Sequence, residues 1–550
     1  MGSPRPVRLV FRRALRRIPS CFRLTAQAGC VLGWLLVAGA LGRAEEDRAR
    51  DEAAREAEAE RLVRRAATVR RIDQLLAEGW ERAGVQPVEL ASDAEFVRRA
   101  YLDLTGIIPR VSEVRAFLAD DRPDKHERLI DELTAAPRHA THLANYWRHT
   151  LLPGGTSPEN LPSAAGVQNW LRAQFVDNVR YDRFVSDFLV VTSGSDTGPA
   201  LFYTALELKP EKLASATARI FLGLQIECAQ CHHHPFDKWR QEEFWGYAAF
   251  FARLRQPREG RPMLQASIED LEVGEVRLPG KEVVIAPAFP DGRTPPQDEP
   301  GTRREQLAIW MASRDNPYLA RAAVNRLWAQ LFGRGLVEPV DDLGPHNPPS
   351  HPELLEELTR DFVASGFDLR ECYRTLARTR AYRLSSRVAE PPVPAELFAR
   401  MELKPLTADQ LYDSWERLRL SSGGAAARAG QASPLSDPRR QAFLLKFPPP
   451  GRSPADYQSG VLQALTLLNG AVTTELTSAG QGGLLGALDA PWFDATERVR
   501  ILFLATLARY PEESEQERFL THLQHGPPAP QAAEDLLWVL VNSAEFAFNH

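Results

Sequence analysis

Cysteine is scarce in this chain, which has five cysteines among 550 residues. So few thiols exclude a disulfide framework as the main support of the fold. The formal net charge is only −5, so we expect no nucleic-acid partner on electrostatic grounds. The sequence also lacks an internal repeat, a Ser-His-Asp ordering, a phosphate-binding glycine loop and a nucleophile elbow. The common signatures of hydrolytic and nucleotide-binding sites are therefore missing.

Apolar residues are present at helical spacing along most of the chain. Phe96, Val97 and Tyr101 share one face of an expected helix that ends at Gly106. Residues Glu211–Ile226 form a second amphipathic pattern, which predicts a helix running directly into Cys228. Hydrophobic residues make up 44% of the chain and charged residues 25%, as in ordinary folded proteins. We predict a mainly α, multi-helical two-domain protein with a small β-containing linker.

The first 44 residues have the order of an export signal. A basic start rich in arginine precedes the apolar run Ala28–Leu41, and Ala38-Gly39-Ala40 offers a small-residue cleavage site. The apolar run is shorter than the roughly 20 residues of a membrane-spanning helix. We expect export to the periplasm or cell surface. Contact with the membrane is expected only if this segment stays uncleaved as an N-terminal anchor.

Changes in composition along the chain predict five segments. The predicted divisions are a signal peptide or anchor at 1–44, a charged helical spacer at 45–71, a first helical domain at 72–255, a linker at 256–302 and a second helical domain at 303–550. The linker is rich in proline and glycine. Its short alternating stretch Glu275–Ile285, interrupted by Pro279-Gly280, predicts a small hairpin.

The strongest chemical motif is the segment Cys228-Ala229-Gln230-Cys231-His232. Two cysteines separated by two residues can both form thioethers with the vinyl groups of a porphyrin. A histidine directly after the second cysteine then supplies an axial ligand to the iron. Since that attachment chemistry takes place outside the cytoplasm, it agrees with the export signal. The sequence therefore predicts c-type haem held by Cys228, Cys231 and His232.

Three other readings of this motif stay open. Cys228 and Cys231 could form a structural disulfide in an oxidising compartment. A zinc or non-haem iron site could instead use His232, His234 and Asp237, with or without the two thiols. A bare thiol redox pair is the third reading, although such pairs usually follow a strand, whereas the segment preceding Cys228 is expected to be helical.

A haem iron needs a second axial ligand or an open position. The expected mature chain offers three methionines, of which Met263 follows His232 most closely. His139, His142 and His149 cluster on one expected helical region, where surface positions explain them as well as ligation does.

A second polar group of residues begins at Asn316 and continues to His351. Arg321 and Asn325 share a helical face within it, and Asp341 or Asp342 are natural partners for its arginines. We expect a structural network there rather than a catalytic or metal site.

Long stretches of this sequence resemble one known family. They are Phe96–Pro109, Cys228–Trp239, Asn316–Trp328, Phe332–Val340 and Asp535–His550. These are similar to large exported proteins of planctomycetes and related bacteria that join two domains of unknown function. The first domain of that family is termed cytochrome-like because of its C-x-x-C-H-x-H-P segment, and the second is a planctomycete-specific C-terminal domain. Members often carry aspartate where this chain has His233, which implies that His233 is not an essential ligand.

The motif and the resemblance together favour an electron-transfer or redox-accessory role with a redox partner protein. The alternatives are a non-haem metal-dependent enzyme and a non-catalytic cell-surface or scaffold protein. Whether the chain is an enzyme is not decided by the sequence.

Overall fold

Helices dominate the structure, a computed structural model, and the predicted mainly α fold class is confirmed. The structure describes residues 20–152, 161–191, 198–255, 268–296, 300–388, 392–419, 435, 437–447, 466, 468, 470–478 and 483–550. Two units, Met1–Ala67 and Thr68–His550, are distinguished within the chain, and each is described by itself.

The first unit contains the N-terminal part of a long helix, α1 (Ser20–Ala83). Alanine, glutamate, aspartate and arginine dominate this helix after Arg43, and alanine, glutamate and arginine are good helix formers. Residues 51–60 are all exposed. The expected export signal lies largely outside the description, because residues 1–19 are not described and neither are side chains before Arg50. Within the described residues, no helix combines the length and apolar character that a membrane-spanning segment requires.

Short helices build the second unit. Its first half contains α2 (Asp93–Thr105), α3 (Val111–Leu118), α4 (Lys125–Ala135), α5 (Pro137–Leu151), α6 (Leu161–Val176), α7 (Tyr181–Leu189), α8 (Ala200–Ala205), α9 (Pro210–Thr217), the π-helical turn η1 (Ala218–Leu222), the 3₁₀ turn η2 (Glu227–Gln230), α10 (Gln241–Ala248) and the 3₁₀ turn η3 (Ala249–Phe251). The expected stop at Gly106 is present, since Gly106 ends α2 with a φ of 73°.

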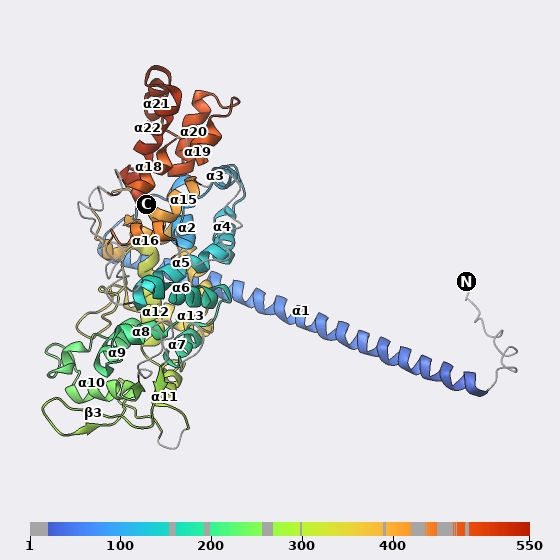
Figure 1. The fold of residues 1–550 in the computed structure, drawn as a ribbon, viewed down its shortest axis with the longest axis vertical. Helices are drawn as coiled ribbons and strands as arrows, with labels where there is room; N and C mark the ends of the chain where they lie inside the picture. The colour runs from blue at the N-terminus through green and yellow to red at the C-terminus, as the bar shows by residue number, and fades with distance from the viewer. Residues whose placement is uncertain are drawn as a thin grey trace. The chain divides into compact units, whose positions relative to one another are not determined.

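The second half continues in the same style. It contains α11 (Arg303–Met311), α12 (Leu319–Phe332), α13 (Pro352–Ala364), α14 (Leu369–Ala377), η4 (Ala381–Arg383), η5 (Ala395–Leu397), α15 (Ala408–Arg419), α16 (Pro438–Leu444), α18 (Ala471–Thr477), α19 (Gly483–Leu488), α20 (Ala495–Leu507), α21 (Glu513–His525), α22 (Ala529–Val541) and α23 (Ala544–Ala547). Helices α20, α21 and α22 pack on one another, and α18 and α19 contact α22 (Figure 1).

The strands are short and antiparallel. They pair as β1 (Leu254–Arg255) with β2 (Glu269–Asp270), β3 (Val276–Arg277) with β4 (Val284–Ile285), and β5 (Lys404–Pro405) with β6 (Phe548–Asn549). The pairing of β3 with β4 confirms the small hairpin predicted over Glu275–Ile285. Residues 256–267 and 297–299 of the expected linker lie outside the described residues.

One hydrophobic core runs through both halves of the second unit. Helix α11 packs on α7, α14 packs on α4, and α12 packs on η1. Two fully buried arginines of α2 also join the halves. Arg98 donates to the carbonyl oxygens of Thr506 and Phe546 over 2.8 and 2.9 Å. Arg99 donates to those of Tyr382 and Leu384 over 2.6 and 2.8 Å.

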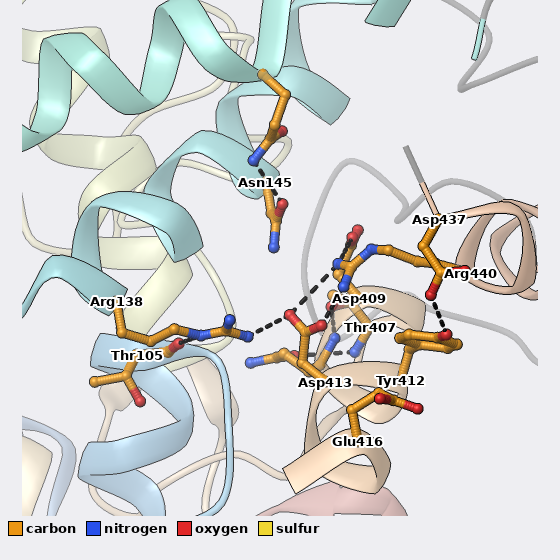
Figure 2. Close-up of polar contacts among 12 residues, drawn as sticks. Thr105, Arg138, Asn145, Thr407, Asp409, Tyr412, Asp413, Glu416, Asp437 and Arg440 are labelled. Carbon is orange, nitrogen blue, oxygen red and sulfur yellow. Dashed lines mark hydrogen bonds and ion pairs between the residues drawn. The ribbon is translucent and has the colours of Figure 1, made fainter. Parts of the chain in front are cut away.

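A buried ionic network links α5 to α15 and α16. The carboxylate of Asp409 accepts hydrogen bonds from Arg148 over 2.8 Å and from Arg440 over 2.5 Å. Asp413, one helical turn further along α15, pairs with Arg440 and with Arg138. Figure 2 shows the side chains of Arg138 and Arg440 converging on these two carboxylates. Paired in this way, the charges satisfy one another away from water.

Candidate functional site

The segment Cys228–His232 lies on a short turn, not at the end of a helix. The helix predicted over Glu211–Ile226 ends early, because η1 terminates at Gly223 with a φ of 65°. The backbone N–H of Leu343 donates to the Gly223 carbonyl over 2.8 Å at this point. A left-handed glycine and a contact from a distant segment therefore override the local helical pattern.

Both cysteines of the motif are accessible. The 3₁₀ turn η2 carries Cys228, and Cys231 directly follows it. The two thiols are free and exposed, whereas Ala229 between them is fully buried and anchors the turn. The turn thus presents two free sulfurs to solvent from a fixed backbone.

Side chains of helix α10 bond to the backbone of this turn. Gln241 Nε2 donates to the carbonyl oxygens of Gln230 and Cys231 over 3.1 and 3.0 Å. The indole of Trp245 donates to the same Gln230 carbonyl over 3.0 Å. These bonds fix the direction in which the residues after Cys231 leave the turn.

The three consecutive histidines differ in which ring nitrogen keeps an unshared lone pair. Nδ1 of His232 lies 2.7 Å from the His233 carbonyl oxygen. Because a carbonyl can only accept, that Nδ1 carries the hydrogen and Nε2 keeps a lone pair. Nδ1 of His233 and Nδ1 of His234 instead accept from the backbone N–H groups of Gln241 and Phe236, over 3.2 and 3.3 Å. In their neutral forms these two rings carry hydrogen on Nε2, so only His232 offers a free Nε2 lone pair.

Asp237 is turned toward the protein, with 4% of its side chain exposed. Its carboxylate accepts from the indole of Trp239 over 3.1 Å and from the backbone of Lys238 over 2.6 Å. It faces His346, whose Nδ1 is 3.8 Å from Asp237 Oδ2 and whose Nε2 is 3.2 Å from Asp342 Oδ2. The structure therefore places Asp237 beside the second half of the unit.

His234 also faces this neighbour, and its ring is stacked on that of His346 with 6.5 Å between the centroids. Within the described residues, no three His, Cys, Asp or Glu side chains are arranged so that they could hold a metal ion. The set of His232, His234 and Asp237 considered from the sequence is accordingly not assembled as a metal site in this structure.

The loop after α12 completes the surroundings of the motif. Asp341 accepts from Gln225 over 3.1 Å and lies 3.6 Å from Arg219, which also pairs with Glu227. Asp341 thus pairs with an arginine of the first half, not with the arginines of α12. The approach of this loop to the motif is invisible to local sequence patterns, because more than a hundred residues separate the two segments.

The expected structural network around Asn325 is present. Asn325 donates to the carbonyl oxygens of Val337 and Val340 over 3.0 and 3.2 Å, and its own side-chain oxygen accepts from the N–H of Val337 over 2.9 Å. Arg326 donates to the carbonyl of Ile220 over 3.2 Å. These buried contacts shape the loop that reaches the motif.

Residues considered as a second haem ligand have other contacts. His139 is buried, and its Nδ1 lies 2.7 Å from the carbonyl of Leu104; a surface position for it is therefore wrong. Burial lowers the pKa of His139 to about 4. His149 contacts Asp409 over 2.7 Å. Met311 and Met401 are buried in the core, and Met263 lies outside the described residues.

Two stretches of the chain match known families. Residues 71–256 match the family described as PSCyt2, a protein of unknown function (DUF1549), and residues 303–442 match the family described as PSD1, a protein of unknown function (DUF1553). The Cys228–His232 motif lies in the first match and the loop with Asp342 and His346 in the second. No curated protein and no solved structure matches the chain.

Proposed function

We propose that Cys228, Cys231 and His232 attach a c-type haem and that the protein serves electron transfer or a related redox role outside the cytoplasm. The observation that carries this proposal is the state of His232. Its Nδ1 is committed to a backbone carbonyl over 2.7 Å, which leaves Nε2 as the ligating atom. Ligating histidines commonly use such a second contact to fix the ring and its tautomer.

The two thiols support the same proposal. Each S–H would add across one vinyl group, so that sulfur bonds one carbon and the hydrogen goes to the other. Nothing leaves and no oxidant is required. Both sulfurs must be free and reachable from one side, and Cys228 and Cys231 are free and exposed on one turn.

The surface beside the motif also suits a flat apolar group. Phe236 is 81% exposed, which is unusual for a large aromatic side chain. A porphyrin held at Cys228 and Cys231 would cover apolar surface of this kind. When bound, the haem would supply one-electron exchange, and the protein's own part is to hold the iron ligand in place.

The N-terminal sequence supports a location outside the cytoplasm, where c-type haem is attached. A basic stretch followed by the apolar run Ala28–Leu41 fits an export signal. A small redox protein would be the natural partner, since the motif is exposed and a haem there would be open to docking.

The test is covalent haem content. The full chain is produced in the periplasm of a host with active haem-maturation machinery, and haem retained after denaturation is measured by absorbance. We expect one haem per chain in the wild type. We expect a total loss of retained haem in Cys228→Ser/Cys231→Ser, and retained haem with an altered spectrum in His232→Ala.

His233→Ala is the matched control, because His233 is exposed and its Nδ1 is engaged by Gln241. It should retain haem with an unchanged spectrum. Wild-type protein that is exported and folded but carries no covalent haem would contradict the proposal, and so would bound zinc or non-haem iron in its place.

A further inference from the structure

A cleft of about 570 Å³ lies between the start of α12 and helix α13. Pro317, Val363 and Ala364 contribute apolar surface to it, and Arg321, Glu356 and Arg360 contribute charges. Its volume falls within the range that binds small organic molecules in proteins.

Arg321 is the unusual residue of this cleft. Its Nε is fully buried and has no hydrogen-bond partner. Most other arginines with a buried, unbonded Nε use a terminal nitrogen instead, as Arg326 does with the carbonyl of Ile220; among the described residues, Arg498 shares the lack of such a contact with Arg321. For Arg321 no hydrogen bond or ion pair is found in the part of the chain that the structure describes. The buried Nε–H therefore loses hydration without gaining an acceptor, while the terminal nitrogens are left to bond a ligand in the cleft.

The position of Arg321 in its helix adds to its preference for an anion. It belongs to the first turn of α12, where the helix dipole contributes partial positive charge. Asn316 Oδ1 already accepts from the N–H groups of Tyr318 and Leu319, each over 2.9 Å. The helix end is therefore formed, and the guanidinium remains as the group that lacks a partner.

The other charges of the cleft restrict the anion. Arg360 pairs with Glu357 over 2.7 Å and 69% of its side chain is exposed. Glu356 is exposed at the cleft, and its carboxylate repels a second negative charge. One carboxylate group with an apolar remainder therefore fits the cleft better than phosphate or a dicarboxylate.

We propose that this cleft binds a small organic monocarboxylate. Its carboxylate accepts hydrogen bonds from Arg321, as planar guanidinium and carboxylate groups favour, and its apolar body lies against Pro317, Val363 and Ala364. This binding is independent of haem attachment and does not rest on it.

The test is calorimetric titration of the full chain with 3-phenylpropionate as the probe. Its neutral counterpart 3-phenylpropanol and inorganic phosphate are titrated separately. We expect saturable binding of 3-phenylpropionate and binding at least about tenfold weaker for the other two, a difference of roughly 1.4 kcal/mol. Arg321→Gln should weaken binding of 3-phenylpropionate by a similar factor.

Two variants keep the result clear. Arg314→Gln removes an exposed charge outside the cleft and should bind as the wild type does. Ala364→Phe narrows the cleft while keeping Arg321, and should abolish binding without unfolding the protein, because Ala364 is exposed. Absent saturable binding, equal affinity for 3-phenylpropanol, or undiminished binding by folded Arg321→Gln overturns the proposal.

Discussion

At the scale of single residues, Asp409 lies at the centre of the buried ionic network. Its side chain is 3% exposed and contacts two arginines and a histidine. Burial alone would raise the pKa of Asp409, but the charges of Arg148 and Arg440 hold it well below the usual range. A carboxylate with a lowered pKa stabilises the fold above its unfolded-state pKa of about 4, and that stabilisation is lost as the pH falls through the lowered value.

Asp409→Asn should therefore lower the free energy of unfolding at neutral pH by about 3–5 kcal/mol, because the buried guanidinium of Arg148 loses its counter-charge and that of Arg440 keeps only Asp413. The measurement is denaturant unfolding at pH 7 and at acidic pH, where the difference from the wild type should shrink.

Glu89→Gln is the control for this variant. The carboxylate of Glu89 pairs with Arg387 at the surface, where the two side chains are 66% and 79% exposed. The free energy of unfolding should change by only about 0–1 kcal/mol. Equal effects of the two substitutions would show that the buried network does not stabilise the fold.

At the scale of elements, the turn that ends η1 decides where the Cys228–His232 motif lies. A Cβ added to Gly223 would stand 1.9 Å from Leu343 Cδ1, in addition to the strain of a φ of +65°. Gly84 has the same φ of +65° but has open space around it. The two positions separate backbone strain from steric collision.

Gly84→Ala should lower the free energy of unfolding by about 1 kcal/mol, from strain alone. Gly223→Ala should cost about 1–3 kcal/mol more, because Leu343 must move away. Denaturant midpoints of the two variants provide the comparison. If Gly223→Ala lowers the free energy of unfolding no more than Gly84→Ala does, the loop carrying Leu343 moves aside without an energetic cost.

Local signals in the sequence predicted much of this element structure. Glycine at position 106 and the alternation before Ile285 act within a few residues, so the helix stop and the hairpin were predictable. The early end of the helix that begins at Pro210 was not predictable, because it depends on the hydrogen bond from the N–H of Leu343 to the Gly223 carbonyl. The free Nε2 of His232 depends likewise on backbone geometry, and the approach of His346 to Asp237 depends on the tertiary fold. The motif could be identified from the sequence, but the residues that surround it in the fold could not.

At the scale of the whole molecule, the two halves of the second unit depend on each other. Helix α2 of the first half places Arg98 and Arg99 among carbonyl oxygens of the second half, and both guanidiniums are fully buried. Burial lowers the pKa of Arg98 to about 10, so it stays charged at neutral pH. Without the second half, Arg98 would lie in an apolar surface without an acceptor, and Arg99 would keep only Glu95.

Residues 72–255 produced alone should therefore fail to fold. Circular dichroism and hydrogen exchange of that fragment should show a loss of protection in α2, and co-production with residues 303–550 should restore it.

Arg98→Met in the full chain should lower the free energy of unfolding by about 2–4 kcal/mol. A fragment that folds cooperatively on its own would contradict this view.

The contacts of Arg98 also determine when, during synthesis, the second unit can complete its folding. The arginine is synthesised 448 residues before Phe546, whose carbonyl it needs. At about 5–20 residues per second, the chain would wait roughly 20–90 s for that acceptor. Throughout that interval helix α2 cannot reach its final environment, so the second unit completes its folding only after synthesis has reached its last residues.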